Sequence, residues 1–132
     1  MTYSHPIEVR FRDLDALNHV NNAVMVSYLE VARWQWWRAY LAGRPFEEEG
    51  FLIARVEVDY RQPIVIQDQV RVEVRCERVG TTSFDLGYRL IRGQDGAVLA
   101  EGCTVQVMLD FATQRPAPIR PETRAWMEGQ RR

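Results

Sequence analysis

Alternating hydrophobic and polar positions fill the second half of the chain. Residues 51–62, 69–79, 83–92 and 98–110 each place apolar side chains at every second position. This period of two is typical of antiparallel strands with one covered face. We therefore predict four strands. In the last three, the residues expected to face the core are Val70, Val72, Val74, Cys76, Phe84, Leu86, Tyr88, Leu90, Cys103, Val105, Val107 and Leu109.

The first part of the chain predicts one more strand and one long helix. Residues 5–12 alternate well enough for a short strand with Ile7, Val9 and Phe11 on one face. Residues 22–42 are apolar over most of a helical circumference. A helix of this kind is normally wrapped by other elements, and at 1.5 Å per residue it is about 30 Å long.

The ends of this helix carry recognisable signals. Asn21 or Asn22 is a suitable N-cap, and Gly43 followed by Pro45 is a suitable stop. Further along, residues 80–82 and 94–96 have turn composition, and a short helix is expected to end near residue 128.

The resulting order is one strand, a long helix and four antiparallel strands. This order predicts an α+β fold in which a curved sheet wraps around the helix. The 132 residues fit a single domain, residues 1–132. Because one sheet leaves the helix partly uncovered, we expect a second copy of the chain to complete its burial.

Charge and composition exclude several function classes. The chain carries 17 basic against 18 acidic residues, and this balance argues against nucleic-acid binding. Every basic residue is arginine, so a lysine Schiff base, a pyridoxal anchor and a P-loop lysine are all excluded. Any catalysis therefore falls mainly to a carboxylate.

The two cysteines and the uncharged residues 16–29 bear on where the protein is located and on whether its thiols are reduced. Cys76 and Cys103 each sit among valines, which favours two small buried hydrophobes in a reducing cytoplasm over a disulfide or a metal site. Residues 16–29 lack charge but are too short and too polar to span a membrane.

The candidate chemistry is concentrated in residues 11–22. Two carboxylates, Asp13 and Asp15, precede His19 and three asparagines, and the segment leads into the helix N-terminus. Unpaired backbone N–H groups there can stabilise a developing oxyanion, and a nearby carboxylate can act as base or nucleophile. Acyl transfer is the reaction class that uses both devices.

Plainer interpretations stand beside this one. Asp13, Asn18 and Asn21 suit turns and helix caps, and His19 alone is typical of a hydrogen-bonded structural residue. One histidine beside two aspartates is also a weak metal site, so no metal and no cofactor are expected. Four other features are assigned structural roles: Ser27 inside the helix, a Glu30–Arg33 pair, core or subunit contacts for Trp34, Trp36 and Trp37, and a solvated run at Glu47, Glu48 and Glu49.

Motifs along nearly the whole chain resemble the hotdog-fold thioesterases, specifically the 4-hydroxybenzoyl-CoA thioesterase-like acyl-CoA thioesterases. The motifs that carry the resemblance are Phe11-Arg12-Asp13-Leu14-Asp15, His19-Val20-Asn21-Asn22, Tyr28-Leu29-Glu30-Val31-Ala32-Arg33, Val58-Asp59-Tyr60-Arg61-Gln62-Pro63, Gly80-Thr81-Thr82-Ser83-Phe84 and Arg115-Pro116-Ala117-Pro118-Ile119. The resemblance implies a five-stranded antiparallel sheet around one long helix, paired into dimers and commonly tetramers, with the active site at the dimer interface.

The resemblance also assigns roles. It puts the catalytic carboxylate on Asp15 and the polarising backbone N–H at about Asn22. The plant acyl-ACP thioesterases, which the same motif also resembles, match at Asp15 and His19, while their catalytic asparagine falls on Leu17, one position before Asn18.

We therefore expect hydrolysis of an acyl-CoA thioester to a free acid and a thiol. Asp15 would act as general base or nucleophile, and His19 or Asn18 would position water or substrate. The arginines considered for coenzyme A phosphates are Arg61, Arg89, Arg115 and Arg120. The alternatives are an acyl-ACP thioesterase and a hotdog or NTF2-like barrel that binds an acyl or small apolar ligand without chemistry.

Overall fold

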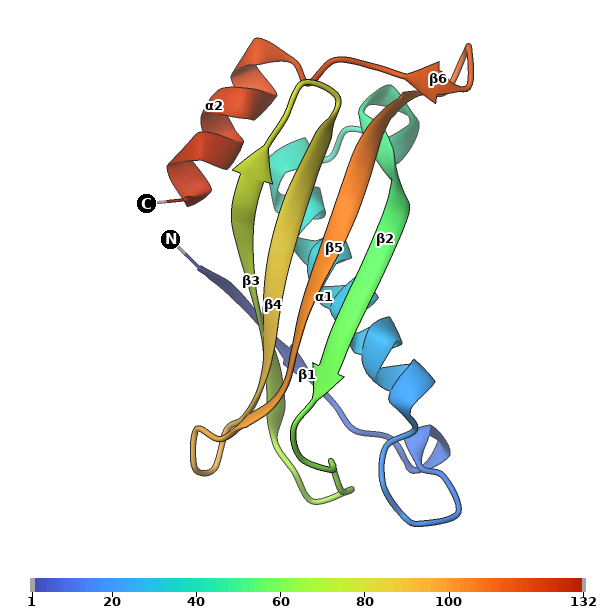
Figure 1. Ribbon diagram of the computed structural model, residues 1–132, viewed down its shortest axis with the longest axis vertical. Coiled ribbons are helices and arrows are strands. Elements are labelled where there is room, and N and C mark those ends of the chain that lie inside the picture. Colours follow the sequence, from blue (N-terminus) through green and yellow to red (C-terminus); the bar gives the residue numbers. More distant parts are fainter. Residues whose placement is uncertain (1, 132) are drawn as a thin grey trace.

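The computed structural model describes residues 2–131. The long strands are joined by short turns, and two helices accompany them (Figure 1). In chain order the elements are β1 (Tyr3–Ile7), η1 (Phe11–Asp13), α1 (Asn22–Leu41), η2 (Phe46–Glu48), β2 (Gly50–Tyr60), β3 (Val70–Val79), β4 (Ser83–Arg92), β5 (Val98–Asp110), β6 (Arg115–Pro116) and α2 (Pro121–Gln130).

One antiparallel sheet curves around α1. The strand order is β1-β3-β4-β5-β2, and the short β6 pairs with β5. Helix α1 lies along one face of this sheet, and α2 lies beside the far end of β3 (Figure 1). This arrangement confirms the α+β prediction of a curved sheet around one long helix. The five expected strands form the sheet, with β6 as a two-residue addition.

Helix α1 begins and ends at the predicted signals. The side chain of Asn21 accepts a 2.8 Å hydrogen bond from the backbone N–H of Ala23 and so caps the first turn. At the other end Ala42 and Gly43 both have positive φ, of 51° and 91°, which ends the helix in the left-handed region.

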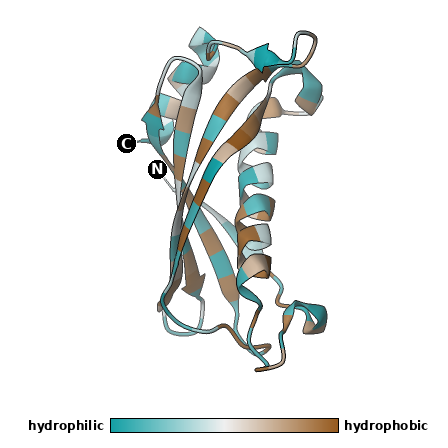
Figure 2. Ribbon diagram, turned by 45° about the vertical axis from the view of Figure 1, so that its right-hand side comes forward, coloured by the Kyte–Doolittle hydropathy of each residue, from teal (hydrophilic) through white to brown (hydrophobic). Residues whose placement is uncertain are grey.

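The core lies between α1 and the inner faces of β3 and β4. Every second residue of these strands is buried as predicted, and Trp36 and Trp37 of α1 pack against Phe84 of β4. Brown and teal segments alternate along the strands that face α1 (Figure 2). The interpretation of Trp36 and Trp37 as core residues is confirmed, whereas Trp34 is 41% exposed.

The predicted inner face of β5 is wrong. Thr104, Gln106 and Met108 face the helix, whereas the apolar positions Cys103, Val105, Val107 and Leu109 lie on the outer face. The register explains this, because Thr104 lies opposite Leu86 and Gln106 opposite Phe84, both buried. The buried polar groups are satisfied by partners on β4. The hydroxyls of Thr104 and Tyr88 lie 2.6 Å apart, and Nε2 of Gln106 donates to the carbonyl of Phe84 over 3.0 Å.

The first strand is shorter than predicted. It ends at Ile7, and Phe11 lies in η1 with 84% of its surface exposed. The carboxylate of Asp13 accepts a 3.0 Å hydrogen bond from the backbone N–H of Arg10 and turns the chain out of the extended conformation.

The prediction that the whole acidic run is solvated is wrong at one residue. Glu47 and Glu48 are exposed, but Glu49 is 3% exposed. Its carboxylate lies 3.1 Å from Nη1 of Arg44 and accepts a hydrogen bond from Thr123. Burial of this charge is possible because it is paired and hydrogen-bonded.

The two cysteines are free thiols. Burial raises the pKa of Cys76 to about 11, so this thiol behaves as the small buried hydrophobe that the sequence predicts. Cys103, also predicted to be buried, is half-buried on the outer face of β5. Among residues 2–131 no helix is long and apolar enough to cross a membrane.

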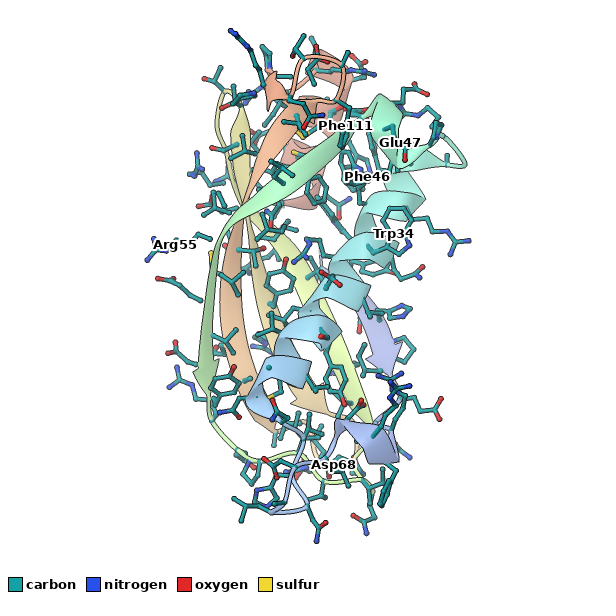
Figure 3. All side chains as sticks on the ribbon, turned by 90° about the vertical axis from the view of Figure 1, so that its right-hand side faces the viewer. Trp34, Phe46, Glu47, Arg55, Asp68 and Phe111 are labelled. Carbon is teal, nitrogen blue, oxygen red and sulfur yellow. The ribbon has the colours of Figure 1, made fainter. Side chains whose placement is uncertain are left out.

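The edge strand β2 stands apart from α1 between its two ends. Helix α1 packs mainly over β1 and β3, whereas β2 pairs with β5 and contacts α1 near its two ends, through Phe51 on Trp37 and Tyr60 on Asn22. Three apolar β2 residues that lie opposite buried β5 residues therefore stay 38–43% exposed: Ile53, Val56 and Tyr60. In Figure 3 the side chain of Arg55 points away from α1, which marks the outer side of the same strand. The three apolar residues leave a strip of exposed apolar surface between α1 and β2, which we call the crevice.

Candidate active site

The loop that leads into α1 is closed by its own hydrogen bonds. The backbone N–H of Asp15 donates to the carbonyl of His19 over 2.8 Å, and that of Asn18 donates to the carbonyl of Asp15 over 3.0 Å. Oδ1 of Asp15 accepts from the N–H of Leu17 at 2.9 Å and of His19 at 3.4 Å. These bonds orient the Asp15 carboxylate and leave Oδ2 without a partner among residues 2–131.

The buried carboxylate of Asp13 holds this loop in place through its hydrogen bonds. Asp13 accepts hydrogen bonds from the guanidinium of Arg10 and from the hydroxyl of Tyr28 on α1, the latter at 2.7 Å. Burial alone would raise the pKa of Asp13, but the hydrogen bonds from Tyr28 and Arg10 outweigh it and hold the pKa below its ordinary value. The carbonyl of Asp13 also accepts from the N–H of Asn21 at 2.9 Å, so the loop is tied directly to the helix cap.

The helix N-terminus supplies an open hydrogen-bond donor. The carbonyl and side chain of Asn21 accept from the N–H groups of residues 23, 24 and 25. The N–H of Asn22 has no acceptor within residues 2–131. It is therefore free to donate to a ligand, at the positive end of the helix dipole.

These groups line one cavity of about 420 Å³ at the end of the crevice. Residues from the loop, the start of α1 and the end of β2 meet there, in the lower part of Figure 1. The lining residues are Asp15, Leu17, His19, Val20, Asn21, Asn22, Met25, Tyr60, Arg61, Gln62 and Pro63. A carboxylate, an imidazole and a helix N-terminus thus surround a space large enough for a small part of a ligand.

The predicted catalytic candidates lie close together, with one exception. Asp15, His19 and Asn22 all line the cavity. Asn18 does not line it and has a φ of 61°, the left-handed conformation that asparagine tolerates well in a turn. Its position fits the alternative turn role better than contact with a substrate.

Of the four arginines considered for phosphate binding, only Arg61 lies at this cavity, where its guanidinium pairs with Glu101 at 3.1 Å. Arg89 pairs with Glu73 on β3, at 3.2 Å. Arg115 belongs to β6 and Arg120 donates to the carbonyl of Glu48, both near the opposite end of the sheet (Figure 1).

Tyr60 is a site residue that reasoning on single residues missed. Its hydroxyl donates to the carbonyl of Asn22 over 3.0 Å and so joins the end of β2 to the start of α1. The only signal for it in the sequence is its place in the motif at residues 58–63. Within residues 2–131, no three histidine, cysteine, aspartate or glutamate side chains are grouped so that they could hold a metal ion.

Comparison with known families gives one match over most of the chain. The model of the thioesterase-like superfamily matches residues 9–127. The long-chain acyl-CoA thioesterase FadM of Escherichia coli is 28% identical over 131 residues, which cover 92% of this chain and 94% of that protein.

Solved structures show the same fold. A thioesterase from Thermus thermophilus, complexed with coenzyme A and Zn, has a TM-score of 0.82 and 36% identity, over 97% of this chain and 93% of that one. A predicted thioesterase from Bacillus stearothermophilus has a TM-score of 0.91 and 27% identity, over 98% of this chain and 96% of that one.

Proposed function

The chain belongs to the thioesterase-like superfamily and is a thioester hydrolase, and on that premise we propose that it hydrolyses acyl-coenzyme A to a free acid and the thiol of coenzyme A. The observation that carries the site assignment is that Asp15 and Asn22 line one cavity, and that the N–H of Asn22 has no acceptor within residues 2–131. Relatives support the substrate class, since FadM is a long-chain acyl-CoA thioesterase and the Thermus thioesterase was solved with coenzyme A.

The N–H of Asn22 is proposed to hold the thioester oxygen. Negative charge develops on that oxygen when the carbonyl carbon is attacked, and a helix N-terminus is suited to stabilise it. Loss of a single donor of this type typically lowers kcat by ~10²–10³.

Asp15 is proposed to act through Oδ2. As a general base, Oδ2 takes a proton from water, the water oxygen attacks the carbonyl carbon, and the carbon–sulfur bond then breaks to release the thiol. As a nucleophile, Oδ2 itself attacks the carbonyl carbon and displaces the thiolate of coenzyme A, and water then hydrolyses the resulting mixed anhydride to the free acid and the Asp15 carboxylate. A single turnover in ¹⁸O-labelled water tests for the nucleophilic route, because label reaches the Asp15 carboxylate only when water attacks the Asp15 carbonyl of the anhydride.

Two pocket residues are proposed to assist. His19 can orient water or substrate from the cavity wall, and Arg61 can reach a phosphate of coenzyme A by exchanging its exposed partner Glu101. An exposed ion pair of this kind contributes little to stability, so its exchange costs little.

The assembly is also a proposal. The unpaired edge of β2 and the exposed apolar residues Leu17, Ile53 and Val56 support a homodimer that covers the crevice and the site loop. The partly buried apolar outer face of β5 supports further pairing into a homotetramer. We place the whole chain in one thioesterase domain, and the free cysteines support a location in the reducing cytoplasm.

A panel of acyl-CoA substrates with a free-thiol readout tests this function. We expect thiol release that is linear in enzyme concentration, with aliphatic and aromatic acyl groups tested from short to long. Matched acyl-carrier-protein substrates test the alternative carrier. Tight acyl-CoA binding without thiol release from either carrier would favour the non-catalytic binding protein and contradict the proposal.

A further inference from the structure

A buried arginine that the proposed reaction does not use lies in the middle of α1. Arg33 is 7% exposed. Its Nη1 donates to the hydroxyl of Tyr88 over 3.3 Å, and its Nη2 lies 3.8 Å from the carboxylate of Glu30, beyond hydrogen-bond distance. No other residue within 2–131 accepts from this guanidinium. Because a buried cation needs paired or hydrogen-bonded partners, its remaining donors favour an oxygen acceptor from outside the chain.

The buried polar groups behind Arg33 hold it in place. The Tyr88 hydroxyl lies 2.6 Å from that of Thr104, and Thr104 is hydrogen-bonded to Gln106. Each of these three side chains is at most 3% exposed. Since every member has a partner, the network fixes the Tyr88 hydroxyl and with it one edge of the guanidinium.

In front of Arg33 lies a cleft of about 220 Å³ between α1 and the start of β2. Apart from Arg33 and Glu30, its walls are apolar: Trp34, Phe46, Phe51 and Ile53. Figure 3 shows Trp34 and Phe46 near the C-terminal half of α1, and their ring centroids are 5.9 Å apart. An apolar cleft with one fixed polar group is the usual form of a small-molecule site.

The cleft and the cavity of the proposed active site are separate and share no lining residue, but both open on the same side, between α1 and β2. Arg33 follows Asn22 by eleven residues of one helix, which places it about 16 Å further along the helix axis. The opposite wall is β2, whose residues Val56 and Tyr60 face the crevice and remain exposed. A thioester carbonyl held at the N–H of Asn22 could thus extend its acyl chain toward Arg33.

We propose that Arg33 determines specificity by binding a neutral oxygen substituent near the far end of a medium-length acyl chain, a hydroxyl or an oxo group. The inference rests on the proposed thioesterase function. A neutral acceptor fits better than a carboxylate, because Glu30 already places one negative charge beside the guanidinium. The preferred substrates are therefore ω-hydroxy or ω-oxo acyl-CoAs of intermediate length.

Matched substrate pairs test this proposal. The free-thiol assay compares acyl-CoAs with their ω-hydroxy and ω-carboxy analogues, from hexanoyl to hexadecanoyl. We expect the ω-hydroxy group to raise kcat/KM by about 10- to 100-fold at one intermediate length, the range of one hydrogen bond to a charged group. The ω-carboxy group should raise it less.

Substitutions on α1 test whether Arg33 causes the preference for an ω-oxygen. Arg33→Met should abolish the preference and leave turnover of the unsubstituted acyl-CoA within about threefold, whereas Arg38→Met, an exposed arginine of the same helix, should change neither. Glu30→Gln should improve the ω-carboxy substrate, since it removes the competing charge. Thermal melting and circular dichroism check that each variant folds, and Arg33→Lys retains the charge if Arg33→Met does not fold.

Several results overturn the inference and leave the proposed function intact. These are thiol release with no ω-oxygen preference at any length, a preference that persists in Arg33→Met, and a change in oligomeric state in Arg33→Met without a change in preference. The last would assign Arg33 to a contact with a second copy. No thiol release from any acyl-CoA would instead contradict the proposed function itself.

Discussion

The hydroxyl of Tyr28 donates a 2.7 Å hydrogen bond to the buried carboxylate of Asp13. Tyr28 belongs to α1, whose first N–H is the proposed oxyanion donor, and Asp13 lies two residues before the proposed catalytic Asp15. This bond therefore links the two halves of the candidate site. The distance between the N–H of Asn22 and the carboxylate of Asp15 depends on this hydrogen bond.

Tyr28→Phe should weaken both stability and turnover. It removes one hydrogen bond from a buried carboxylate, so we expect a loss of about 1.5–3 kcal/mol in the free energy of unfolding. Because small displacements of catalytic groups are costly, kcat should fall by about 10- to 100-fold. Denaturant unfolding and the thiol assay measure the two effects. Ser27→Ala, at the exposed neighbouring position, is the control, and equal behaviour of the two variants would show that the bond has no positioning role.

Acid should destabilise the protein partly through Asp13. The hydrogen bonds from Tyr28 and Arg10 outweigh the effect of burial, so the pKa of Asp13 is lower in the folded than in the unfolded chain. The associated stability is complete above the ordinary aspartate pKa of about 3.9 and is lost as pH falls through the lower folded value. The free energy of unfolding, measured from about pH 6 to pH 2, should fall more steeply in the wild type than in Asp13→Asn. Parallel curves would contradict this assignment.

The oxyanion donor can be removed without removing the helix. Proline is favoured at the first position of a helix, and Asn21 before it has φ −59° and ψ 138°, which a following proline accepts. Asn22→Pro should therefore fold normally and lower kcat by ~10²–10³, since it removes the backbone N–H together with the side chain. Asn22→Ala retains the N–H and should keep kcat within a few fold. Equal kcat in the two variants would exclude this N–H as the donor.

Glu49 should contribute more to the free energy of unfolding than the exposed Glu47 of the same acidic run. Its buried carboxylate pairs with Arg44 and accepts from Thr123, so Glu49→Ala should lower the free energy of unfolding by about 2–3 kcal/mol. Glu47→Ala, in the same acidic run but exposed, should change it by less than about 0.5 kcal/mol. Chemical denaturation measures both. A similar small effect in both variants would mean that Glu49 gains nothing from its buried contacts.

Much of the fold could be predicted because its signals are local. The bounds of β4 and β5 match the predicted ranges, since clean alternation is broken by turns at residues 80–82 and 94–96. The inner face of β5 could not be predicted, because Thr104 and Gln106 are buried through partners on β4 that only the folded register brings near. Polarity alone therefore predicts that the opposite face of β5 is buried.

The candidate site likewise contains residues that the sequence predicts and residues that only the fold brings together. Asp15, His19 and Asn22 are neighbours in sequence, so their meeting at one cavity follows from a short loop and a helix cap. Tyr60 and Arg61 reach the cavity only because β2 ends beside the start of α1. Single arginines such as Arg89 and Arg120 carry no local signal of what they bind, and the structure pairs them with acidic side chains that do not line the cavity.

The central claim is that the Asp15 carboxylate carries out thioester hydrolysis, and Asp15→Asn tests it most directly. The asparagine carbonyl can still accept from Leu17 and His19, so the loop should keep its shape and the protein its melting temperature. With an acyl-CoA that the wild type hydrolyses, the account predicts a fall in kcat of about 10²–10⁴ in the free-thiol assay. Turnover near the wild-type rate in a folded Asp15→Asn protein would contradict it.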